Sequence, residues 1–243
     1  MKNFFRTNAY LRRIKSFYEF LASARKSRFV VLLELISQNE IEYVIDLGAN
    51  VGQFALDLRR AGYLGKILSF EPVSNTFAIL KQNAKREKRW EVFNLAIGSH
   101  VGKETIKISN NDSLSSSFKN MNDLHLTNFP KSYFVSEEIV SVSTLDEQFK
   151  MMKIPPNKCL LKIDVQGFER EVLAGGTNTI PSIPLCYIEG SLSPLYDEEY
   201  DLRELLNDLH ELGHHIYELF PGVRAKNGKL LQVDIISTYS ESD

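Results

Sequence analysis

The chain has 243 residues, 43% hydrophobic and 25% charged, a composition typical of a globular protein with one large domain. No run of 18 apolar residues is present, which excludes an ordinary membrane-spanning helix, and the N-terminus lacks the features of a secretory signal. The two cysteines, Cys159 and Cys186, lie in apolar segments. They favour buried thiols in a reducing, cytoplasmic compartment over a disulfide or a metal site.

The net charge of −2 is unevenly distributed. Residues 1–28 contain eight Lys and Arg and one Glu, a net charge of +7, which leaves −9 for the rest. This basic, aromatic-rich leader could contact an anionic membrane surface, or it could pack its aromatic side chains on the domain. The acidic remainder argues against nucleic acid as a partner. We expect an N-terminal helical extension over 1–38, broken near Ser27, and one domain over 39–243.

Strand-like and helical patterns alternate in the first half of that domain. EYVIDLG reads as a strand, 51–61 as a helix ended by Gly62, and KILSFEP as a second strand. A second helix is expected over 74–85, with Ser74 as its N-cap, and a third strand over 91–97. This order predicts a parallel sheet with right-handed crossovers.

The segment 98–142 interrupts the alternation and is expected to be an inserted hairpin with a polar loop, either a functional lid or a surface excursion. The alternation resumes with helices over 143–150, 168–174 and 199–212 and with strands at CLLKIDV and over 183–189. HHIYELF and LLQVDIISTY are separated by only a turn, so they must pair antiparallel. The predicted fold class is α/β.

Candidate functional residues follow the predicted strands, because ligands of open parallel sheets bind beyond the carboxyl ends of the strands. Most of these tips carry a carboxylate. The candidates are Asp46, Gly48, Ala49, Asn50 and Gly52 after the first strand, Glu71 and Pro72 after the second, Ala96 and Ile97 at the third, Asp164 after the fourth, and Glu189 after the fifth.

These tips are poorly suited to a phosphate-rich ligand. Asn50 occupies the second glycine position of a dinucleotide fingerprint, and no lysine follows the glycine turn as in a Walker loop. Glu71 lies 25 residues after Asp46, where a carboxylate can accept both ribose hydroxyls. A ligand with a ribose, an adenine and a cationic tail fits better, and S-adenosylmethionine is such a ligand.

The motifs resemble those of a known group. D-x-G-x-N-x-G with F-E-P is similar to Rossmann-like S-adenosylmethionine-dependent methyltransferases, and LLKIDVQGFEREVLAGG at 160–176 closely resembles the signature of the FkbM-type family. The serine-rich stretch 115–117 and STLDE at 143–147 follow that family's order, and the resemblance covers roughly 40–240. Gln166 stands where the family usually has glutamate. The resemblance implies a seven-stranded sheet with an antiparallel last strand and methyl transfer, usually to a hydroxyl of a sugar, glycan or other secondary metabolite.

The candidate residues receive distinct expected roles. Gly48 and Gly52 let the backbone approach the methionine part of the cofactor, and Asn50 offers an amide. Glu71 binds the ribose, with Asn94 as a weaker helper, and Ala96 with Ile97 lines the adenine.

Asp164 either holds the cofactor's ammonium or acts as general base on an acceptor hydroxyl, and Glu189 is the other candidate base. The sequence does not rank the two. Glu169 is expected to cap or pair, whereas His100 and His125 flank the insertion as weak catalytic candidates. The alternative function is a non-catalytic binding or scaffold protein that docks to a membrane or partner through its basic N-terminal helix.

Overall fold

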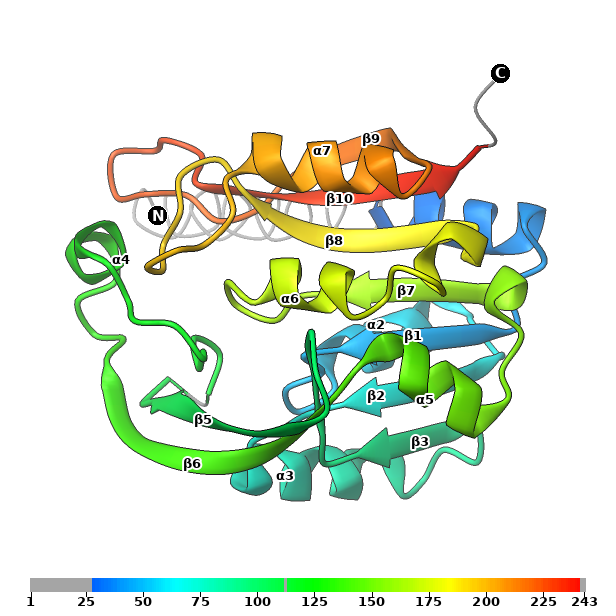
Figure 1. Cartoon of the computed structure of the whole chain (residues 1–243), viewed down its shortest axis with the longest axis horizontal. Helices are drawn as coiled ribbons and strands as arrows, with labels where there is room; N and C mark the ends of the chain where they lie inside the picture. The colour runs from blue at the N-terminus through cyan, green and yellow to red at the C-terminus, as the bar shows by residue number, and fades with distance from the viewer. Residues whose placement is uncertain (1–27, 112, 241–243) are drawn as a thin grey trace, which may run out of the picture.

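The computed structural model describes residues 28–111 and 113–240 (Figure 1). A helix occupies 28–38. The expected break near Ser27, and almost all of the leader proposed to contact a membrane, lie outside the described residues. Within them, no helix is both long and apolar enough to cross a bilayer.

Seven strands form the main sheet, in the order β3-β2-β1-β7-β8-β10-β9. All neighbouring pairs run parallel except those of β10, which is antiparallel to both β8 and β9. The predicted seven-stranded, mostly parallel sheet with an antiparallel last strand is therefore confirmed. The strands are β1 (Tyr43–Leu47), β2 (Lys66–Phe70), β3 (Trp90–Phe93), β7 (Cys159–Ile163), β8 (Leu185–Ser191), β9 (His214–Pro221) and β10 (Gln232–Tyr239).

Helices cover both faces of this sheet, because successive strand residues point to opposite faces and both sets are apolar. Val44 packs into a core with the helix at 28–38, α2 (Gln53–Ala61) and α3 (Ser74–Ala84). Its neighbour Ile45 packs into a second core on the other face. That face is covered by α5 (Leu145–Met152), α6 (Glu169–Ala174) and α7 (Leu202–Glu211).

The insertion forms a second, three-stranded sheet in the order β4-β6-β5. It lies on the side of the molecule toward which β2, β3 and β7 point their carboxyl ends (Figure 1). The insertion therefore closes over the edge where a ligand is expected. The insertion contributes β5 (Gly102–Ser109), α4 (Asp123–Asn128) and β6 (Phe134–Ser143), and β4 (Ala96–Ile97), directly before it, completes the small sheet.

The prediction of a single third strand over 91–97 is wrong, because this segment forms two short strands that belong to different sheets. β3 ends at Phe93 and belongs to the main sheet, whereas β4 pairs with β6 of the insertion. Asn94 lies at the break, and its amide donates to the carbonyl oxygens of Glu71 at 3.0 Å and Pro72 at 2.8 Å. The side chain therefore ties the end of β3 to the second strand tip.

The start of α3 also differs from the prediction. Val73, not Ser74, is the N-cap residue. The backbone amide of Ser74 donates to the Glu138 carboxylate of β6 at 3.2 Å, and its hydroxyl contacts the same group. A side chain of the insertion thus satisfies one of the amides that the start of a helix leaves without an intrahelical partner.

Candidate active site

The turn after β1 is tightly folded on the neighbouring strand tips. Gly48 has φ of +69°, and a Cβ there would lie 1.8 Å from the carbonyl oxygen of Asp164. Gly48 and Ala49 donate their amides to Phe70, at 3.1 and 3.0 Å. Only glycine can follow β1 at this distance from the loop after β7.

The remaining amides of the turn are also engaged within the protein. The Asn50 amide donates to Glu71 Oε2 at 2.9 Å, and the Val51 amide donates to Asn50 Oδ1 at 2.8 Å. The Gly52 amide donates to the Ala49 carbonyl at 2.8 Å. A phosphate site at a helix start needs free amides. This turn instead uses its amides to hold itself and the Glu71 carboxylate.

A buried lysine lies behind the turn. Lys162 in β7 is the register neighbour of Asp46 in β1, and Asp46 is the register neighbour of Ser69 in β2. The Lys162 ammonium lies 3.1 Å from Asp46 Oδ1, and the Ser69 hydroxyl donates to Asp46 Oδ2 at 2.9 Å. The ammonium also donates to the carbonyl oxygens of Leu47 at 3.0 Å and Gly48 at 2.9 Å.

Electrostatics keep this lysine charged inside the protein. Burial by itself lowers the pKa of Lys162, but Asp46 and then Asp164 more than compensate, so that its pKa is raised above the ordinary value. Asp46 is fully buried and its charge is already matched. Asp46 therefore supports the turn from behind and is not available to a ligand.

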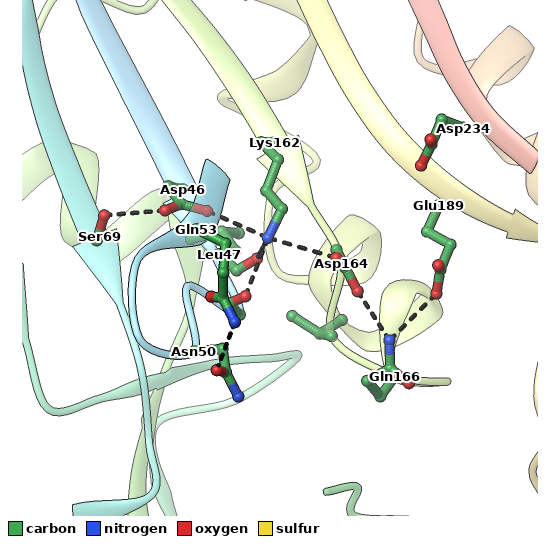
Figure 2. A network of polar contacts seen from close by, with 12 residues as sticks. Asp46, Leu47, Asn50, Gln53, Ser69, Lys162, Asp164, Gln166, Glu189 and Asp234 are labelled. Atoms are coloured by element: carbon green, nitrogen blue, oxygen red, sulfur yellow. Dashed lines mark hydrogen bonds and ion pairs between the residues drawn. The ribbon is translucent and has the colours of Figure 1, made fainter. Parts of the chain in front are cut away.

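The polar chain continues from Lys162 across the sheet (Figure 2). Asp164 Oδ2 lies 3.7 Å from the Lys162 ammonium. The Gln166 amide nitrogen donates to Asp164 Oδ1 at 2.9 Å and to Glu189 Oε2 at 3.2 Å. The Gln232 amide of β10 donates to the same Glu189 oxygen at 2.9 Å. One glutamine side chain thus joins the carboxylates at two neighbouring strand ends.

Three different segments fix the orientation of Gln166. The Tyr196 hydroxyl donates to Gln166 Oε1 at 3.0 Å, which directs the amide nitrogen toward the two carboxylates. The Ser117 hydroxyl donates to the Gln166 carbonyl at 2.6 Å, and Gln166 itself has φ of +54°. Glu169 at the start of α6 accepts from the amides of Val165 and Gly167, at 3.1 and 3.3 Å, and so caps this loop as expected.

We expect Gln166→Glu to make folding stability more sensitive to pH. A carboxyl group cannot donate to both Asp164 and Glu189, and close carboxylates raise one another's pKa. The free energy of unfolding should match that of the wild type near pH 5 and fall about 1–2 kcal/mol below it by pH 8. Urea denaturation at the two pH values measures this difference, with exposed Gln82→Glu as the control. Equal loss in both variants would contradict the role given to the Gln166 amide.

A cavity of about 270 Å³ opens in front of the turn, and we call it the first cavity. Its polar groups include Glu71 and Asp164, whereas Phe70, Ile97 and Phe168 provide apolar surface. Asp164 is the more accessible carboxylate, with its side chain 37% exposed. Glu71 is almost fully buried, and burial raises its pKa to about 7, although the amides of Val73 and Asn50 oppose the shift.

The structure brings most of the predicted cofactor residues to this cavity and leaves two outside it. Gly48, Ala49, Asn50, Glu71, Pro72, Ala96, Ile97 and Asp164 line the first cavity. Asp46 and Gly52 do not line it. Asp46 faces Lys162, and a Cβ on Gly52 would lie 2.6 Å from the Trp90 ring, so Gly52 provides close packing and not an approach to the ligand.

A second cavity, of about 570 Å³, adjoins the first. Leu114 of the insertion and Gln166 line both. Glu189 lines only the second cavity and Asp164 only the first, so the two candidate bases are on different sides of Gln166. His125 also lines the second cavity. His100 lines neither.

Sequence reasoning missed two polar residues of the site. Lys162 lies within the motif at 160–176 but was given no role. A lysine within the apolar run CLLKI does indicate a functional or structural contact, because a buried charge requires a partner. Gln232 gives no comparable signal, because its contact with Glu189 depends on the antiparallel pairing of β10 with β8. Within the described residues, no cluster of His, Cys, Asp or Glu is arranged to bind a metal ion.

The sequence matches the Methyltransferase FkbM domain over residues 46–216. It is 27% identical over 170 residues to the 2-O-methyltransferase NoeI of Sinorhizobium fredii strain NGR234. The aligned region covers 68% of this chain and 69% of NoeI.

Similar solved structures include magnesium protoporphyrin IX methyltransferase from Synechocystis PCC 6803 with bound S-adenosylmethionine. It has 9% identity and a TM-score of 0.47, and the match covers 90% of this chain and 81% of that one. The methyltransferase domain of bacterial CtHen1-C has 11% identity and a TM-score of 0.47, with 90% of this chain and 100% of that one covered.

The sheet order, the glycine turn after β1 and the acidic tip of β2 define a Rossmann-like methyltransferase. The chain belongs to the FkbM methyltransferase family, and it is an S-adenosylmethionine-dependent methyltransferase.

Proposed function

We propose that this enzyme transfers a methyl group from S-adenosylmethionine to a hydroxyl oxygen of a sugar, glycan or secondary metabolite. The observation that carries the proposal is the polarity of the first cavity, which presents Glu71 and Asp164 while every amide of the glycine turn from Gly48 to Gly52 is already bonded. Such a site disfavours phosphates and favours a neutral nucleoside with a cationic tail.

The residues at the first cavity fit the cofactor. Glu71 would accept the ribose hydroxyls, and Asp164 would receive the positive end of the methionine part. Ala96 and Ile97 would contribute apolar surface to the adenine. Lys162 also lines the first cavity, but its ammonium is held by Asp46 and two carbonyl oxygens. The cofactor supplies an electrophilic methyl group, and the protein's part is to bind and orient the reactants.

Transfer to oxygen is supported by the name of the relative NoeI, a 2-O-methyltransferase, and by the carboxylate of Glu189 in the adjoining cavity. An alcohol has a pKa far above neutral, so a nearby base assists its attack on carbon.

We expect the wild type to bind S-adenosylmethionine with one-to-one stoichiometry in isothermal titration calorimetry. At pH 8, above the Glu71 pKa of about 7, Glu71→Gln replaces a largely ionised acceptor by a neutral group. This change should weaken binding about tenfold or more, since a hydrogen bond to a charged group contributes roughly 1.5–3 kcal/mol. Glu91→Gln, at an exposed carboxylate of β3 paired with Lys66, is the control and should not alter binding. Absence of binding to the folded wild type would refute the proposal.

A further inference from the structure

The second cavity combines hydrogen-bonding groups with apolar surface, and two exposed lysines, Lys131 and Lys226, also line it. Its amide and hydroxyl groups come from the insertion and from β10 and include Asn128, Ser132 and Gln232. Its apolar groups come from the insertion and later loops and include Phe129 and Leu195. Small-molecule sites typically pair apolar walls with a few placed polar groups in about this volume. This composition suits a ring that carries several hydroxyl groups.

His125 adds a neutral imidazole to this lining. The side chain is buried and contacts the rings of Phe129 and Tyr196, with centroids 5.4 Å away in each case. Neither ring nitrogen has a hydrogen-bond partner among the described residues. Burial lowers the pKa of His125, so the ring offers one donor and one acceptor. Buried polar atoms without a partner are uncommon in folded proteins, and a bound hydroxylated ligand would account for these two.

Glu189 is the only carboxylate among the described residues that line the second cavity. Its Oε2 accepts from the amides of both Gln166 and Gln232. Its Oε1 accepts no hydrogen bond from any described residue. One oxygen is therefore held in place while the other is available to a ligand.

Asp164 is placed differently. It lines the first cavity, and its two oxygens face Gln166 and the Lys162 ammonium. Asp164 thus lies beside Lys162 and would receive the cofactor's cationic end, so it is not directed at an acceptor hydroxyl in the second cavity. Glu189 has no such cation within the polar chain, and burial followed by the charge of Asp164 raises its pKa well above the ordinary value. These differences favour Glu189 over Asp164 as the base for an acceptor hydroxyl.

We propose that the second cavity binds a hydroxylated, sugar-like acceptor, that Glu189 is the base for its hydroxyl, and that Gln166 is the positioning residue between acceptor and cofactor. The inference rests on the proposed function. The acceptor oxygen forms a bond to the methyl carbon while the carbon–sulfur bond breaks, and the bonding pair remains on the uncharged sulfur of S-adenosylhomocysteine. The hydroxyl proton passes to Glu189 Oε1, which becomes a neutral carboxyl group.

Binding to the protein loaded with S-adenosylhomocysteine tests the cavity and the ligand class. Methyl glycopyranosides, titrated by calorimetry and saturation-transfer NMR, should bind at least tenfold more tightly than methoxycyclohexane, because that analogue lacks the ring hydroxyls that His125 and the amide side chains would bond. Val223→Trp should fill the second cavity and abolish glycoside binding, with cofactor affinity unchanged within twofold. Val101→Trp, at an exposed position outside both cavities, is the control.

Methyl transfer from S-adenosylmethionine to those glycosides then tests the base. Glu189→Gln should retain glycoside binding within threefold and lower the transfer rate about 100-fold. It should also abolish the rise of the rate with pH that the wild type shows. Asp234→Asn, which removes the carboxylate opposite Glu189 in the β8–β10 pairing, should stay within threefold of the wild type on the high-pH plateau.

The outcomes separate the two proposals. Failure of the wild type to bind S-adenosylhomocysteine would remove the proposed function. Binding of that product, without binding of any methyl glycopyranoside or with unchanged glycoside binding in Val223→Trp, would overturn only the acceptor cavity. A Glu189→Gln enzyme that retains the wild-type rate and pH profile would overturn only the assignment of the base.

Discussion

Lys162→Met should lower the free energy of unfolding by about 3–5 kcal/mol, the usual cost of removing one partner from a buried ion pair. The methionine would leave Asp46 fully buried with only the Ser69 hydroxyl as a side-chain partner. It would also leave the carbonyl oxygens of Leu47 and Gly48 without their donor. Urea denaturation followed by circular dichroism measures the change.

Two further variants distinguish burial from charge in this experiment. Lys66→Met breaks an exposed ion pair with Glu91 on the neighbouring strands and should cost less than about 1 kcal/mol. The double variant Asp46→Asn with Lys162→Met removes the uncompensated charge and should recover at least half of the loss. Equal effects of Lys162→Met and Lys66→Met would contradict the view that the buried pair supports the glycine turn.

The second large effect concerns the pH dependence of folding. Burial, with a smaller contribution from Glu199, raises the pKa of Glu169 to about 8, well above the ordinary value near 4.5. A carboxyl group with a raised pKa in the folded state contributes stability that is fully present below pH 4.5. That contribution is lost as the pH rises through about 8. We expect the free energy of unfolding to decrease by on the order of 4 kcal/mol across this range.

Glu169→Gln isolates this contribution, because a glutamine oxygen can still accept from the amides of Val165 and Gly167. The variant should resemble the wild type near pH 5 and be more stable near pH 8.5. Glu71, whose pKa is about 7, also lowers the free energy of unfolding as the pH rises, by a smaller amount and equally in both proteins. Denaturation curves at five pH values between 5 and 9 give the two slopes, and parallel slopes would show that Glu169 does not hold the proton.

Local patterns were sufficient to predict the sheet. Each β-α-β unit contains an apolar run, a turn and an amphipathic helix, so the parallel pairing of β1, β2 and β7 follows from general rules of chain connection. The positions of Glu71 and Asp164 follow as well, because they stand directly after their strands. The division of the predicted third strand into β3 and β4 could not be predicted in this way. It is accompanied by hydrogen bonds from Asn94 to the carbonyl oxygens of Glu71 and Pro72, which are distant in the sequence.

The direction of each side chain was harder to predict than its position. The position of Asp46 in the motif suggested that it contacts the ligand. In the structure its register neighbour in β7 is Lys162, and the two side chains form an ion pair. Gly52 was expected to approach the cofactor, but the Trp90 ring occupies the place of its side chain. In both cases, the decisive partner lies on a strand that is distant in the sequence.

Gln166 gains a physical explanation from the structure. A glutamate at that position would face Asp164 and Glu189 with a third carboxylate, whereas the glutamine amide donates a hydrogen bond to each of them. The departure from the family pattern is therefore compatible with the proposed chemistry. It changes the charge at the border of the two cavities and keeps a hydrogen-bonded connection between them.

A crystal structure of the protein with S-adenosylhomocysteine tests the central claim most directly. The account predicts the nucleoside in the first cavity, with its ribose hydroxyls on Glu71 and its sulfur on the side of Gln166 that faces the second cavity. Density for the product outside the first cavity, or a ribose that does not contact Glu71, would contradict it.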